Sequence, residues 1–378
     1  MSQTIYLDCN ATTPLEPEVI EMMRKYLVEE FGNEGSRTHE YGAAAKQAVQ
    51  KARDQVAAVA GVGREEVIFT SGATESNNLA ILGLAAFGEE TGRKHILSTQ
   101  IEHKAVIEPL EELAQRGFEV EFLRPNVGGW VTEKQIASAL RPDTLLVSVM
   151  HANNETGVIQ PIGEIAALLE KHPAFFHVDA AQTFGKLIKP LQNKRVDLIS
   201  VSAHKIYGPK GVGALITRRR GVDRVPLKPR IFGGGQERGL RPGTLPVHLI
   251  AGFGLAAEVA LKDHKTREAV NLRIRASLLE AFAAMGASIH GEQERGLPHV
   301  INLSIPGVNS EAAMVALKDL VAISNGSACT SANYTLSHVL KAMGLPDDEI
   351  LSALRISWCH MTPEVDWNAV TARLASLR

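Results

Sequence analysis

The sequence has few cysteines and lacks any long apolar run. Three cysteines in 378 residues, Cys9, Cys329 and Cys359, are too few for a disulfide framework, so a reducing, cytoplasmic location is expected. No stretch approaches the roughly 20 apolar residues that span a bilayer, and the first residues lack the pattern of a signal peptide. The chain is therefore expected to have no membrane partner.

The sequence also lacks a large excess of positive or of negative charge. A formal net charge of −2 gives no reason to expect direct binding of nucleic acid or of an anionic membrane. The basic run at 218–220 is accordingly interpreted as a solvated loop face. The length is sufficient for a large core and predicts one large and one small domain.

Short apolar, β-branched runs alternate with helical patterns through the middle of the chain. The expected strands lie at residues 66–70, 95–98, 120–123, 145–149, 175–179, 198–202 and 213–216. Amphipathic stretches lie between them, for example at 132–140 and 162–171. This alternation predicts an α/β fold with a mostly parallel sheet that helices cover on both faces.

The pattern changes after residue 216. A glycine-rich loop at 233–243 and a long helical pattern at 246–285 precede a smaller α+β unit. That unit is expected to contain strands at 300–304 and 354–358, helices at 310–320 and 334–343, and a last helix from 363. The expected division is an N-terminal segment 1–15 packing with the small domain, a large domain 16–255, and a small domain 256–378 that carries the Cys329 loop.

Two strands of the large domain are followed by residues with chemical potential. Lys205 lies in a turn after the strand at 198–202, and Asp179 ends the strand at 175–179. Ligands gather at the carboxyl ends of strands in open α/β sheets. The lysine could form a Schiff base and the aspartate could pair with a protonated pyridine nitrogen. Each residue alone also fits a plainer interpretation, a surface lysine and a helix-capping aspartate.

Three further segments follow expected strands. The turn at 70–76 enters a helix whose backbone amides could bind phosphate, although Ser71 could simply be a helix cap. His103 could stack on a flat ring or exchange protons, although it could also be structural. His151 and Asn154 follow the strand at 145–149.

Cys329 lies among small, polar, turn-forming residues at 324–332. Free cysteines are commonly buried, but this setting favours an exposed, mobile loop whose thiolate could act as a nucleophile. Cys9 and Cys359 have no comparable setting and are assigned no role. The histidines and cysteines lack close metal-ligand spacing, so no metal site is expected.

Seven motifs occur in order from about residue 4 to about residue 367. They are Tyr6-Leu7-Asp8-x-Asn10-Ala11-Thr12-Thr13-Pro14, Gly72-Ala73-Thr74-Glu75-Ser76, Glu102-His103-Lys104, Asn153-Asn154-Glu155, Ser202-x-His204-Lys205-x-Tyr207-Gly208-Pro209-Lys210-Gly211, Gly243-Thr244-Leu245-Pro246 and Ser327-Ala328-Cys329-Thr330-Ser331. Each motif alone is a weak signal, but the ordered set is specific. In this set the chain resembles the cysteine desulfurases of the NifS/IscS type.

The resemblance implies a fold-type I pyridoxal-phosphate enzyme, with a mostly parallel seven-stranded sheet domain and a smaller α+β domain, acting as a homodimer. It implies that Lys205 holds the cofactor. The other cofactor-binding residues that it implies are Ala73, Thr74, His103, Asn154, Asp179, Gln182, Ser202, His204 and, from the partner subunit, Thr244. Asp179 would pair with the pyridine nitrogen and Gln182 with the ring hydroxyl. Thr74, Ser202, His204 and Thr244 would hold the phosphate, and His103 would stack on the ring.

The same resemblance implies the reaction. L-Cysteine would be converted to L-alanine, with Lys205, His103 and Cys329 catalytic, and with Asn154, Arg355 and Asn33 binding the substrate. The sulfur would pass to Cys329 as a persulfide and then to an acceptor or scaffold protein. Iron–sulfur cluster assembly, tRNA thiolation and DNA phosphorothioation remain open as destinations.

Alternatives to this reaction use the same site. A selenocysteine lyase or a small-amino-acid aminotransferase would keep the cofactor, and a carrier protein would bind it without catalysis. Four features depart from the family pattern: Cys9, Glu34, Pro242 and the stretch 358–360. None removes a catalytic group, but they leave the acceptor open.

Overall fold

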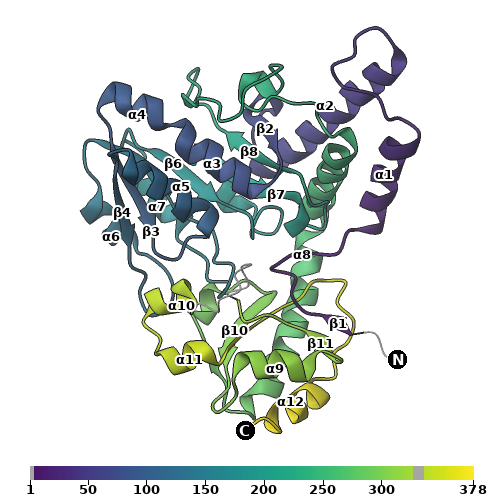
Figure 1. Cartoon of the computed structure of the whole chain (residues 1–378), viewed down its shortest axis with the longest axis vertical. Helices are drawn as coiled ribbons and strands as arrows, with labels where there is room; N and C mark the ends of the chain where they lie inside the picture. Colours follow the sequence, from purple (N-terminus) through teal and green to yellow (C-terminus); the bar gives the residue numbers. More distant parts are fainter. Residues whose placement is uncertain (1–3, 327–335) are drawn as a thin grey trace.

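The computed structural model describes residues 4–326 and 336–378. In Figure 1 a unit built on a large sheet occupies the upper half of the view, and a smaller unit occupies the lower half. The long helix α8 (Val247–Ala283) runs from the upper unit into the lower one. Because α8 continues through residues 255 and 256, the predicted division at that point falls inside a helix and stays a prediction.

The upper unit is organised around seven strands within the described residues. Their spatial order is β2 (Val67–Thr70), β8 (Gly213–Thr217), β7 (Leu198–Ser202), β6 (Phe175–Asp179), β5 (Thr144–Ser148), β3 (His95–Thr99) and β4 (Glu119–Leu123). The pairs among β7, β6, β5, β3 and β4 are parallel, and β8 is antiparallel to both of its neighbours. The predicted α/β fold with a mostly parallel sheet is confirmed.

Helices cover both faces of this sheet. Helices α3 (Ala73–Gly83), α4 (Ala85–Thr91) and α5 (Lys104–Gln115) pack with one set of strand side chains. Helices α2 (Glu40–Ala60), α6 (Glu133–Ala139), α7 (Ile162–Leu168) and the first half of α8 pack with the other set, and α1 (Pro17–Val28) lies against α8. The strands other than β4 are therefore buried over most of their residues and read as continuous apolar runs, whereas the edge strand β4 stays partly exposed and carries Glu119 and Glu121.

The smaller unit has its own core. It contains an antiparallel sheet of β12 (Ala353–Ser357), β10 (Val300–Ser304) and β9 (Ser288–Ile289), covered by α9 (Ser310–Leu317), α12 (Trp367–Ala375) and the end of α8. Helices α10 (His338–Met343) and α11 (Asp347–Leu351) complete it, and β1 (Ile5–Tyr6) pairs in parallel with β11 (Val321–Ala322). The last helix begins at Trp367, later than the predicted residue 363, because the Asp366 side chain caps it.

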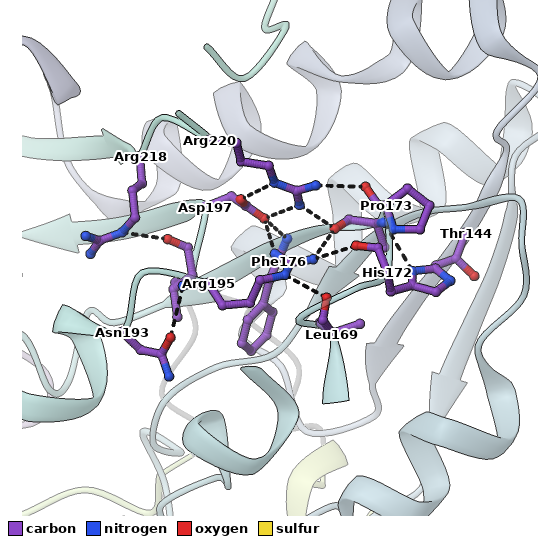
Figure 2. A network of polar contacts seen from close by, with 12 residues as sticks. Thr144, Leu169, His172, Pro173, Phe176, Asn193, Arg195, Asp197, Arg218 and Arg220 are labelled. Carbon is purple, nitrogen blue, oxygen red and sulfur yellow. Dashed lines mark hydrogen bonds and ion pairs between the residues drawn. The ribbon is translucent and has the colours of Figure 1, made fainter. Parts of the chain in front are cut away.

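The basic run at 218–220 is only partly solvated, so the prediction of a loop face was wrong for two of its residues. The Arg218 side chain is buried and donates hydrogen bonds to three main-chain carbonyls. Figure 2 shows Arg220 and Arg195 converging on the buried carboxylate of Asp197, which also accepts a hydrogen bond from Phe176 N. The antiparallel strand β8 causes this, since it brings the run beside the start of β7.

None of the helices between residues 4 and 326 or 336 and 378 combines the length and apolarity that a membrane crossing requires.

Candidate active site

A cavity of about 660 Å³ opens where the parallel strands end, between the large sheet and the smaller unit. Its volume lies within the range typical of small-molecule sites, roughly 300 to 1,000 Å³. Ten of the residues predicted from the sequence line it: Ala73, Thr74, His103, Asn154, Asp179, Gln182, Ser202, His204, Lys205 and Arg355. The segments that follow β2, β3, β5, β6 and β7 thus meet at one edge of the sheet, as expected for an open α/β sheet.

Lys205 lies in the short turn after β7. Its ammonium group donates hydrogen bonds to the main-chain oxygens of Asn10 and Ala11. Burial, together with the positive charges of Arg355 and Lys186, lowers the pKa of Lys205 to about 7. A lysine with such a pKa is largely a neutral amine at slightly alkaline pH, which is the form that attacks a carbonyl.

Asp179 ends β6 and is buried beside the same cavity. Its carboxylate accepts hydrogen bonds from Asn77 Nδ2 at 2.8 Å and from Ala181 N at 2.9 Å. A carboxylate offers about four acceptor sites, so Asp179 can still accept a hydrogen bond from a protonated ring nitrogen. Gln182, three residues later, donates to the Asn10 carbonyl, while its own Oε1 is buried without a hydrogen-bond partner in the described chain.

The N-terminus of α3 forms the opposite end of the cavity. The N-cap residue is Gly72, and within the described residues no side chain caps the helix there. A Cβ on Gly213 would lie 2.7 Å from Gly72 Cα, so glycine is needed for this turn to pack against β8. Ser202 and His204 also line this region, and burial lowers the pKa of His204 to about 4. Free helix amides with neutral hydrogen-bonding side chains suit a phosphate group.

Arg355 and His103 lie on two other walls. Arg355 donates to Asp8 Oδ1 at 2.7 Å and to the Asn154 carbonyl at 3.1 Å, and its Nε is buried without a partner in the described chain. This guanidinium can therefore still bind a carboxylate. His103 caps α5 by accepting from Ala105 N, and burial lowers the pKa of His103, which favours the neutral ring.

The family model of the class-V aminotransferases matches residues 5–370. The chain belongs to the aminotransferase class-V family. It is 46% identical to the cysteine desulfurase IscS of Vibrio cholerae over 97% of this chain and 90% of that protein. It is equally identical, with the same coverage, to the cysteine desulfurase IscS of Methylococcus capsulatus.

Solved structures agree with this membership. The structure of DndA from Streptomyces lividans is 50% identical, with a TM-score of 0.83, over 92% of this chain and 98% of that one. A NifS-like protein is 36% identical, with a TM-score of 0.90, over 99% and 98% of the two chains. The resemblance predicted from the motifs and the fold-type I architecture are therefore confirmed.

Two of the predicted site residues that the structure describes do not line the cavity, and a third lies outside the described residues. Asn33 is exposed, and its Oδ1 accepts from Gly35 N at 2.8 Å. Thr244 is also exposed and lies away from the cavity, as expected if it serves the partner subunit. Cys329 lies outside the described residues.

Other lining residues of the class-V site were not singled out from the sequence. Asn10, Asn77 and His338 line the cavity, and His338 Nε2 lies 2.9 Å from the Glu102 carbonyl. Asn10 belongs to the first of the seven motifs, which could have indicated it. Among the described residues no group of histidine, cysteine and carboxylate side chains could hold a metal ion.

Proposed function

We propose that this class-V chain is a cysteine desulfurase that uses pyridoxal phosphate. The observation that carries the proposal is the cavity itself, which is lined by a lysine with a lowered pKa, a buried aspartate and an uncapped helix N-terminus. The similarity to proteins named cysteine desulfurase over nearly the whole chain supports the same reaction. A complex with cysteine has been solved for a neighbour, SspA, which is 36% identical with a TM-score of 0.83.

The residues present fit pyridoxal phosphate. Asp179 would pair with the ring nitrogen, the unpartnered Gln182 Oε1 would accept from the ring hydroxyl, and the amides at Ala73 and Thr74 would hold the phosphate with Ser202. When bound, the cofactor supplies an electron sink for the bonds at the α-carbon of the substrate. His103 would stack on the flat ring, and its lowered pKa, which favours the neutral form, supports this role because no positive charge is added there.

Substrate and proton handling would fall to this chain's own side chains. Arg355, with Asn154 beside it, would bind the carboxylate of L-cysteine. The Lys205 amine would take the proton from the α-carbon, which its lowered pKa permits near neutral pH.

Cys329 would take the sulfur. Its thiolate would attack the β-sulfur of the substrate, so that a sulfur–sulfur bond forms as the carbon–sulfur bond breaks. The electron pair of the broken bond would stay with the three-carbon product, which takes up a proton at its β-carbon and leaves as alanine. The described residues on either side of its segment, Gly326 and Leu336, both line the cavity, which supports this role. The persulfide would then pass to an acceptor or scaffold protein.

The first experiment is an assay of the purified protein with L-cysteine and a reductant, following alanine and sulfide together. Equal amounts of both products, lost in Cys329→Ala, are expected. Alanine at the wild-type rate from the Cys329→Ala variant would contradict the role of Cys329. A yellow, cofactor-loaded protein that produces no alanine would contradict the desulfurase assignment and lead to selenocysteine and then to aminotransferase substrates.

The dimer and the location complete the proposal. Thr244 of one protomer would enter the cavity of the other, which is supported by its exposure on a segment that also exposes the apolar side chain of Phe232. Light scattering tests this, with a monomer mass as the contrary result. A cytoplasmic location is supported by the two described cysteines, Cys9 and Cys359, which are both free.

A further inference from the structure

Two cysteines from opposite ends of the chain meet beside the candidate active site. The N-terminal segment runs parallel to the end of β12: Ser357 N donates to Leu7 O at 2.9 Å, and Cys9 N donates to Ser357 O at 3.0 Å. This places Cys9 and Cys359 in one buried side-chain cluster. Their side chains form a small apolar cluster with Tyr207, and each is 1% exposed.

The polar groups around the pair distinguish the two sulfurs. Thr362 Oγ1 donates to Cys359 Sγ at 3.7 Å. The interaction with the Cys9 thiol and the donation from Thr362 lower the pKa of Cys359, whereas the pKa of Cys9 is raised. Lys186, whose amine lies 3.1 Å from His299 Nε2, contributes positive charge nearby. The hydrogen bond from Thr362 would stabilise a thiolate on Cys359, so Cys359 is assigned as the nucleophile and Cys9 as its thiol partner.

The pair is joined to the active-site wall. Asn10, the residue after Cys9, donates from its main chain to Ser357 Oγ at 2.9 Å and accepts from Lys205 through its carbonyl oxygen. Arg355, on β12, forms an ion pair with Asp8 at 2.7 Å. A covalent bond between the two sulfurs would thus fasten the segment that lines the cavity to the strand that carries Arg355.

A second, much smaller cavity lies beside the cluster. It is lined by Tyr207, which belongs to the same apolar cluster as the two cysteines, and by Lys186 and His299. It has no lining residue in common with the cavity that Lys205 lines. A small oxidant that approached the pair from this side would not pass through the substrate site.

We propose that Cys9 and Cys359 form a redox-responsive dithiol that hydroperoxides convert to a disulfide. The Cys359 thiolate attacks the peroxide, whose O–O bond breaks, and with one proton this gives a sulfenic acid and water or an alcohol. The Cys9 sulfur then attacks the Cys359 sulfur, its proton leaves with the hydroxyl group as water, and the S–S bond forms. The two thiols lose two electrons and the peroxide gains them. The proposal does not depend on the desulfurase assignment, since it needs neither substrate nor Cys329.

The test is peptide mapping of the purified, cofactor-loaded protein after treatment with hydrogen peroxide. Remaining thiols are alkylated and the protein is digested without reductant. The expected product is a pair of peptides joined through Cys9 and Cys359, absent from Cys9→Ser and from Cys359→Ser but still formed in Cys329→Ser. Detection only of disulfides that contain Cys329, or of sulfinic acid at Cys359 without a cross-link, would overturn the proposal.

A second measurement tests whether the disulfide fastens the N-terminal segment to β12. The unfolding midpoint of the oxidised protein should rise and return to its original value with dithiothreitol, because the cross-link joins positions near both ends of the chain and restricts the unfolded state. In Cys359→Ala, made alongside Cys359→Ser in case serine disturbs the apolar cluster, peroxide treatment should not change the unfolding midpoint. A cross-linked protein whose midpoint equals that of the reduced protein would overturn the proposed fastening of the segment.

Discussion

Replacing Asp197 by asparagine should destabilise the fold while leaving the active site intact. Its carboxylate is buried and accepts from Arg195 at 2.7 Å, from Arg220 at 2.7 and 2.8 Å, and from Phe176 N at 2.6 Å (Figure 2). Asparagine keeps the shape but removes the charge, so the buried Arg195 loses its counter-ion. Breaking a buried ion pair in this way costs about 3 to 5 kcal/mol.

This loss of stability should lower the thermal unfolding midpoint by a measurable amount. A chain of this length unfolds with an entropy of roughly 0.8 kcal/mol per kelvin, so about 4 kcal/mol lowers the midpoint by about 5 °C. Differential scanning calorimetry measures it. The matched control is Asp319→Asn, since the Asp319–Arg373 pair is exposed at 58% and 41% and should give a shift too small to separate from the wild type. Equal midpoints for the two variants would refute the reasoning, as would a loss of alanine formation per folded molecule in the Asp197 variant.

Three predictions concern the cavity. The first is that covalent uptake of pyridoxal phosphate by the cofactor-free protein should slow about tenfold for each pH unit below 7. The reason is that the Lys205 amine, with its pKa of about 7, becomes protonated there. A rate that does not change between pH 5 and pH 7 would contradict this. Asp179→Asn, assayed at saturating cofactor, should lower kcat for alanine formation about 10- to 100-fold, since a charge-assisted hydrogen bond is lost, and an unchanged kcat would exclude the pairing. Arg355→Lys should raise KM for L-cysteine about tenfold with less effect on kcat, because lysine cannot bind a carboxylate through two parallel hydrogen bonds. An unchanged KM would mean that the substrate carboxylate binds elsewhere.

The sequence predicted the large sheet well because of how parallel strands are buried. All seven expected strands are present within two residues of their predicted ends, and every one except the edge strand β4 is buried over most of its residues. The two-residue strands β9 and β11 could not be predicted, since two residues carry no periodicity. The burial of Arg218 could not be predicted from the sequence either, because it depends on carbonyl groups that only the tertiary fold brings together.

The site was predictable where it follows from the sheet. Asp179 and Lys205 end or follow neighbouring parallel strands, so the topology alone places them at one edge. The ion pair of Arg355 with Asp8 was not predictable from spacing, since it joins residues near the two ends of the chain. The roles of the individual side chains, including Cys329, stay predictions for the experiments above.

The charges around Lys205 follow from the same long-range contacts. Arg355 lowers the pKa of the lysine, whereas Asp8, which raises it, is also the ion-pair partner of Arg355. A substrate carboxylate that binds to Arg355 adds negative charge near the lysine and should therefore raise its pKa. An amine that becomes more basic once the substrate carboxylate is in place is better suited to accept the α-proton than the amine of the empty cavity. With Arg355 binding the substrate carboxylate as proposed, the basicity of Lys205 would depend on whether the substrate is bound.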